Sequence, residues 1–122
     1  MITPGIKKII ENNVVALTTV NKFGKPHAIA VACVKVVGGK IIISNSHIKE
    51  TIKNLNINNN VALAVWNKEW EDACVGFELK GKAAYSVEGK WADFVKNMPE
   101  NEGYLIMGAI VVEVNKIKEL KS

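Results

Sequence analysis

The side chains most able to do acid–base or nucleophilic chemistry are two histidines and two cysteines. His27 follows Pro26 at a turn, and His47 precedes an expected helix, so each fits a turn residue as well as a proton carrier. Cys33 and Cys74 lie far apart without a CxxC spacing, which disfavours a metal site and a disulfide. No Ser-His-Asp order, HExxH motif or paired-carboxylate spacing is present. The sequence therefore assigns no catalytic residue and no metal ligand.

The positive charge of the chain comes entirely from lysine. There are 16 lysines and no arginine, and the formal net charge at pH 7 is +4. This balance suits an anionic ligand, but the lysines form no block and are interpreted as solvated faces of strands and helices. A basic barrel that binds single-stranded nucleic acid through Trp66, Trp70 and Phe77 is a less favoured alternative, because these aromatics are scattered. We therefore expect no nucleic-acid partner.

Length and composition indicate one domain spanning residues 1–122. A chain of 122 residues, 48% of them apolar, can bury one core but not two. Its apolar runs are much shorter than the roughly 20 residues that a membrane helix needs. The first residues do not resemble a secretory signal. We expect a soluble cytoplasmic protein with no membrane contact.

Short strands dominate the expected secondary structure. Thr3 and Pro4 predict the start of a helix that ends near Asn12, and further helices are expected from His47 and over residues 91–98. Strands are expected at residues 14–20, 27–37, 40–44, 61–66, 77–85 and 104–115. Because most connections are short, the strands should pair antiparallel. The pattern predicts a mainly β fold, an antiparallel barrel with a few helices at its corners.

Six segments together resemble a known family. They read VVALTT (14–19), GKPH (24–27), KIIIS (40–44), TIKNL (51–55), GFELKGKA (76–83) and GAIVV (108–112). In their order and spacing they resemble the pyridoxamine 5'-phosphate oxidase-like FMN-binding split barrels, particularly the short FMN-binding proteins of anaerobic bacteria and archaea. The resemblance covers nearly the whole chain. It implies a six-stranded antiparallel Greek-key split barrel and a homodimer with one FMN per subunit at the interface.

The resemblance also implies which residues hold the FMN. The end of the third strand and the following helix would bind the phosphate through Ser44, Asn45, Lys49, Thr51 and Asn54. A helix start suits an anion because its N–H groups are unpaired. The second strand would offer backbone groups to the isoalloxazine ring at Ala30, Val31 and Ala32. The neighbouring subunit would add Trp70, Val75 and Gly76.

The chain departs from the family where phosphate recognition is concerned. Many relatives carry arginine or lysine where this chain has Glu50 and Thr51, which implies weaker phosphate binding. Without arginine the chain cannot build a bidentate clamp on a phosphorylated substrate. We therefore expect an FMN-dependent oxidoreductase or electron carrier without true pyridoxamine phosphate oxidase activity. The alternative is a dimer that binds another flavin-like or tetrapyrrole ligand, such as a deazaflavin or haem.

Overall fold

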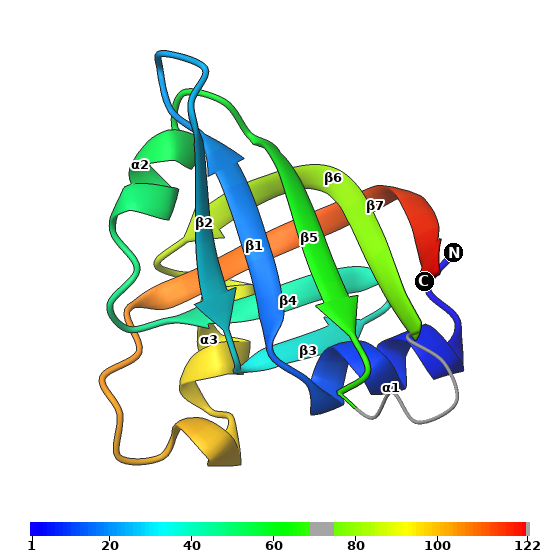
Figure 1. The fold of residues 1–122 in the computed structure, drawn as a ribbon. Coiled ribbons are helices and arrows are strands. Elements are labelled where there is room, and N and C mark those ends of the chain that lie inside the picture. Colours follow the sequence, from blue (N-terminus) through cyan, green and yellow to red (C-terminus); the bar gives the residue numbers. More distant parts are fainter. Residues whose placement is uncertain (69–74, 122) are drawn as a thin grey trace.

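The computed structural model describes residues 1–68 and 75–121, which form one curled antiparallel sheet with helices at its ends (Figure 1). The strands are β1 Val15–Val20, β2 Pro26–Val31, β3 Val34–Val37, β4 Lys40–Asn45, β5 Asn60–Trp66, β6 Val75–Ser86 and β7 Gly108–Lys121. The helices are α1 Pro4–Asn12, α2 Glu50–Leu55, α3 Lys90–Lys96 and the 3₁₀ helix η1 Pro99–Asn101. No helix among the described residues is long and apolar enough to cross a membrane. The predicted fold class, a mainly β antiparallel split barrel, is confirmed.

The sheet has the order β2-β1-β5-β6-β7-β4-β3, so the two edge strands are consecutive in sequence. The chain leaves β2 at one edge and reaches β3 at the other through Ala32 and Cys33. There the Cys33 carbonyl accepts a hydrogen bond from the Ser44 N–H at 3.3 Å, which ties the crossing to β4. The curled sheet is therefore an open barrel, and two residues connect its two edge strands across the opening.

The prediction of one strand over residues 27–37 was wrong, and this accounts for seven strands where six were expected. Val31 is buried at the end of β2, and Val34 and Val36 are buried in β3. Two inward side chains three residues apart, Val31 and Val34, break the period of two that a continuous strand requires. The chain bends at this phase shift and changes from one sheet edge to the other.

Other observed element boundaries can be compared with the predicted ones, and the differences have local causes. The predicted start of α1 is confirmed, since the Thr3 hydroxyl accepts the Ile6 N–H at 3.2 Å. The helix expected from His47 begins only at Glu50. Asn45 Oδ1 accepts the Ile48 N–H at 2.7 Å, and this side-chain turn keeps residues 46–49 out of the helix. The final strand begins at Gly108 rather than at Tyr104.

The core lies inside the curled sheet and is built from the alternating inward side chains of its strands. In β6 the predicted alternation is confirmed: Leu79 and Ala83 are buried, while Lys80 and Lys82 are exposed. Helix α1 contributes Ile10 to this core. A smaller cluster lies between α3 and strands β4 and β7 and consists of Ile42, Val95, Met98 and Ala109. The half-buried Trp91 packs against this cluster. Trp91 is thus part of the packing, as its spacing predicted.

Candidate functional site

A hollow of about 400 Å³ lies between the free edge of β2 and the segment that leads into α2. We call it the Thr51 hollow. It is lined by His27, Ile29, Ala30, His47, Ile48, Lys49, Glu50 and Thr51. It brings together Ala30, Lys49 and Thr51, three of the residues that the resemblance assigned to the flavin. It also includes both histidines of the chain, which sequence reasoning left as turn residues.

The Thr51 hydroxyl is the feature of this hollow that most needs a partner. Thr51 is 1% exposed, and its Oγ1 atom has no hydrogen-bond partner among the described residues. A buried hydroxyl left without a partner costs about 1–3 kcal/mol. One turn later, Asn54 is also buried, but its Nδ2 group donates to Thr19 Oγ1 at 3.0 Å. The Thr51 hydroxyl is therefore buried and unpaired, whereas the Asn54 amide already positions the helix against β1.

The charge around the hollow is mixed. Lys49 is exposed at its rim and makes no ion pair in the described part of the chain. Glu50 stands next to it and opposes an anion. Helix α2 has only six residues, and Lys49 makes no side-chain cap at its start. An anion placed in the hollow would have Lys49 and Thr51 as its neighbours.

The edge of β2 supplies a second kind of contact. Among the described strands β2 pairs only with β1, in a register that places Ala30 opposite Ala16. Backbone N–H and C=O groups on the other side of β2 consequently have no strand partner. They border the Thr51 hollow through Ala30. A flat polar ring could be hydrogen-bonded along this edge.

Two predicted phosphate ligands, Ser44 and Asn45, lie outside the Thr51 hollow. Successive residues of a strand point to opposite faces, and these two end β4. The Asn45 side chain donates to Tyr85 Oη at 2.8 Å and accepts from the Ile48 N–H, so it shapes the turn. Ser44 faces a different cavity, which it shares with the predicted ring contact Ala32.

Val75 and Gly76, two of the three residues expected from a neighbouring subunit, are distant from the hollow within one chain. Val75 and Gly76 begin β6, where Gly76 pairs with Trp66 and Leu120, at the end of the sheet away from α2 (Figure 1). Trp70 lies outside the described residues. Only a second copy of the chain could bring these residues to the hollow, which is how the resemblance assigned them.

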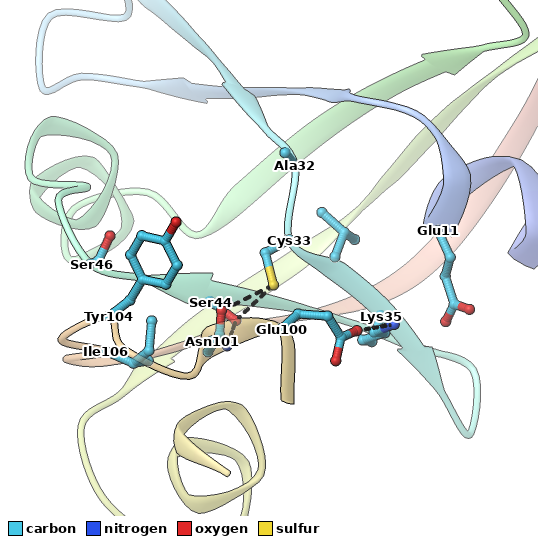
Figure 2. Close-up of a pocket in the computed structure, with 11 residues that line it drawn as sticks. Glu11, Ala32, Cys33, Lys35, Ser44, Ser46, Glu100, Asn101, Tyr104 and Ile106 are labelled. Carbon is cyan, nitrogen blue, oxygen red and sulfur yellow. Dashed lines mark hydrogen bonds and ion pairs between the residues drawn. The ribbon is translucent and has the colours of Figure 1, made fainter. Parts of the chain in front are cut away.

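The second cavity, about 470 Å³, lies below the crossing between β2 and β3 (Figure 2). We call it the Cys33 pocket. It is lined by Glu11, Ala32, Cys33, Val34, Lys35, Ser44, Ser46, Glu100, Asn101, Tyr104 and Ile106. Sequence reasoning missed this pocket. No local pattern connects η1 with β3 and β4, although the buried Asn101 does so in the folded chain.

Three side chains on the floor of this pocket form a closed ring of hydrogen bonds. Ser44 Oγ donates to Cys33 Sγ at 3.6 Å, and Cys33 Sγ donates to Asn101 Oδ1 at 3.3 Å. Asn101 Nδ2 donates back to Ser44 Oγ at 2.9 Å and also to the Val95 carbonyl at 2.8 Å. The ring connects β4, the strand crossing and η1.

An ion pair lies at one end of the same pocket. Lys35 Nζ and Glu100 Oε2 are 2.5 Å apart. The hydrogen bond to Glu100 is the main cause of a raised pKa at Lys35, to which Glu11 also contributes. The hydrogen bond from Lys35 in turn lowers the pKa of the Glu100 carboxyl. Both groups therefore stay charged at neutral pH.

The outer face of β2, β1 and β5 carries small side chains. The rows Ala30–Ala16–Ala64 and Ala28–Thr18–Ala62 run side by side across the three strands. Their neighbours Val15, Leu17 and Leu63 face the core. In Figure 1 no helix crosses this face. We call it the small-residue face.

The amino-acid sequence was compared with family models and with known proteins. A sequence model of the family described as pyridoxamine 5'-phosphate oxidase matches residues 2–118. An uncharacterized protein of Methanocaldococcus jannaschii is 28% identical over 126 aligned positions, covering 99% of this chain and 82% of that protein.

Solved structures show the same fold. HupZ of Group A Streptococcus superposes with a TM-score of 0.89 at 21% identity, covering 100% of this chain and 96% of HupZ. An FMN-binding protein from Syntrophomonas wolfei gives 0.76 at 17% identity, covering 93% of this chain and 79% of that one. HutZ, a heme storage protein from Vibrio cholerae, gives 0.73 at 19% identity, covering 98% and 94%. At these identities the likeness establishes the architecture.

Proposed function

Because this chain belongs to the pyridoxamine 5'-phosphate oxidase family, we propose that it binds FMN and serves as an FMN-dependent oxidoreductase or electron carrier. The phosphate would lie in the Thr51 hollow, and the ring would lie along the edge of β2. FMN supplies reversible redox chemistry when bound, and the protein binds and orients it. The neighbour from Syntrophomonas wolfei, which is an FMN-binding protein, supports this choice of cofactor.

The observation that carries the proposal is the buried, unpartnered Thr51 hydroxyl. A phosphate oxygen would accept its hydrogen bond, and Lys49 at the rim would supply the counter-charge. Hydrogen bonds to charged groups contribute about 1.5–3 kcal/mol each. Two such contacts offset the repulsion that Glu50 adds.

The proposal includes a homodimer. Small side chains on a sheet face allow a second copy to approach closely, and the small-residue face borders the Thr51 hollow through Ala30. A partner packed there could bring its own Trp70, Val75 and Gly76 to the flavin. The site would then be complete only in the dimer.

Turnover of pyridoxamine or pyridoxine phosphate is not part of the proposed function. The chain has no arginine for a bidentate contact with a second phosphate. Conversion of pyridoxine 5'-phosphate at an ordinary enzymatic rate, about 1 per second or faster, would contradict this part of the proposal.

The deciding experiment compares Thr51→Val with the wild type. Valine keeps the shape and removes the hydroxyl, so FMN affinity should fall by about tenfold or more, while riboflavin, which lacks the phosphate, should bind unchanged. The ligand-free variant should be more stable than the wild type by about 1 kcal/mol, since a buried unpaired hydroxyl is gone. Flavin fluorescence and urea denaturation measure the two effects.

Lysine variants provide a matched pair. Lys49→Ala should weaken FMN binding, whereas Lys90→Ala should not, because Lys90 lies over the Trp91 ring on α3, outside the hollow. Equal FMN affinity for wild type, Thr51→Val and Lys49→Ala would place the phosphate elsewhere. An absorption spectrum of the purified protein tests the cofactor itself: a Soret band would indicate haem, and a deazaflavin spectrum would indicate that alternative.

A further inference from the structure

The Cys33 pocket has the size of a ligand site but is not used by the proposed flavin contacts at Thr51 and Lys49. Its volume of about 470 Å³ is within the range of roughly 300–1,000 Å³ that is usual for small-molecule sites. Figure 2 shows Glu11, Lys35 and Glu100 at one end and Ser46, Tyr104 and Ile106 at the other. The chemistry of these groups indicates what kind of molecule would fit.

The floor of the pocket can accept hydrogen bonds but cannot donate them. In the ring formed by Ser44, Cys33 and Asn101, each hydroxyl, thiol and amide hydrogen already has an acceptor within the protein. Ser44 Oγ and Asn101 Oδ1 each retain a free lone pair. A ligand that touches this floor must therefore bring donors.

The charged end favours a positive ligand for an independent reason. Lys35 pairs with Glu100, and Glu11 is a second carboxylate on the same side. One Glu11 oxygen, Oε2, accepts the Val36 N–H at 2.8 Å. Two carboxylates against one ammonium leave an excess of one negative charge at this end of the pocket.

The remaining walls are apolar. Ala32 and Ile106 contribute methyl and methylene groups, and Tyr104 adds an aromatic ring. The Tyr104 and Ser46 hydroxyls make no hydrogen bond with the described residues and can either donate or accept one. The pocket therefore combines an acceptor-rich, negative end with an apolar end.

We propose that the Cys33 pocket binds a small organic cation, a primary amine carried on an apolar or aromatic body. The ammonium group lies toward Glu11, Glu100 and the free lone pairs of Ser44 and Asn101. The body lies against Tyr104 and Ile106. This inference does not rest on the proposed flavin site, because its charged groups are not those of the Thr51 hollow.

The test uses three matched probes with the protein as purified: 2-phenylethylamine, 2-phenylethanol and 3-phenylpropionate. Binding is followed by amide chemical shifts in ¹H–¹⁵N spectra. The amine should shift the amides of Val34, Ser46 and Ile106 and bind about tenfold or more tightly than the alcohol, since a charge-assisted hydrogen bond is lost with the alcohol. The carboxylate should bind most weakly.

Variants of pocket residues test whether the amine binds in the Cys33 pocket. The double variant Glu11→Gln, Glu100→Gln should lower amine affinity about tenfold and leave the alcohol unaffected. Glu88→Gln, an exposed residue before α3, is the matched control and should bind the amine as the wild type does. Ala32→Phe should fill the pocket and abolish binding of all three probes, while its spectrum shows that the chain is folded.

Equal affinity for amine and alcohol, an unaffected double variant, or shifts centred on the Thr51 hollow would each overturn the proposal. So would the absence of saturable binding, which is also the result expected if a second copy of the chain filled the pocket. FMN affinity measured on the same double variant separates the two proposals. It should equal that of the wild type whether or not the amine binds.

Discussion

Asn101 shows how one side chain can hold three elements together. It is 6% exposed and hydrogen-bonds to Cys33, Ser44 and the Val95 carbonyl. Asn101→Ala leaves buried groups without partners, so we expect a loss of about 3 kcal/mol in the free energy of unfolding. Asn97→Ala is the control, because exposed Asn97 donates only to the Asp93 carbonyl and should cost about 0.5 kcal/mol or less. Equal urea midpoints for the two variants would show that the ring does not stabilise the fold.

At the same scale, the assignment of flavin-binding residues stays a prediction, but the structure shows which of these residues lie together. Ala30, Lys49 and Thr51 border one hollow, although β3 and β4 separate Ala30 from the other two along the chain. The family resemblance grouped these residues, and no local sequence pattern does so. Ser44 and Asn45 lie outside this hollow, and the sequence alone does not give the directions of their side chains, because these depend on the register of β4 against β7. Nothing in the sequence marks Asn101, whose partners are far away in the chain.

At the scale of elements, the pairing of the long strands β6 and β7 requires a glycine at position 81. The register shifts between Lys80 and Gly81, so that Asn115 has no opposite residue. A Cβ atom on Gly81 would overlap the Glu113 carbonyl, so Gly81→Ala should destabilise the protein by about 3 kcal/mol, near the upper end for overpacking. Gly5→Ala, in α1, would place a Cβ atom at an ordinary van der Waals distance of 3.9 Å from Thr3 Oγ1, and should instead stabilise the protein by about 0.5–1 kcal/mol. Thermal or urea denaturation compares the two, and a neutral Gly81→Ala would contradict the packing argument.

Helices and strands could be predicted where the sequence pattern is regular. Their boundaries could not be predicted where a tertiary contact or a single side chain interrupts the pattern. The alternation in β6 and the Thr3 cap of α1 follow directly from residue types. The break after Val31 and the late start of α2 do not, because the first depends on which edges the sheet brings together and the second on the Asn45 turn. Both misplaced boundaries border the candidate site.

For the whole molecule, dimerisation and flavin binding should be coupled. Ala16 lies at the centre of the small-residue face, paired with Ala30 and Ala64. Ala16→Arg should therefore give a monomer by light scattering at micromolar concentration and a large loss of FMN affinity. Val37→Arg, on the exposed edge strand β3, should remain dimeric and bind FMN normally. A monomeric wild type, or a dimeric Ala16→Arg variant with full FMN affinity, would contradict the shared site.

The crossing between the two edge strands also has a limited length. Three peptide steps separate Val31 from Val34, and a chain can extend at most about 11 Å over that length. The number of residues in this link therefore limits how far apart the two rims of the open barrel can stand. The Cys33 pocket borders this link at Ala32 and Cys33. An insertion here would let the two rims stand further apart at the Cys33 pocket, so the length of one short connection limits the width of that pocket.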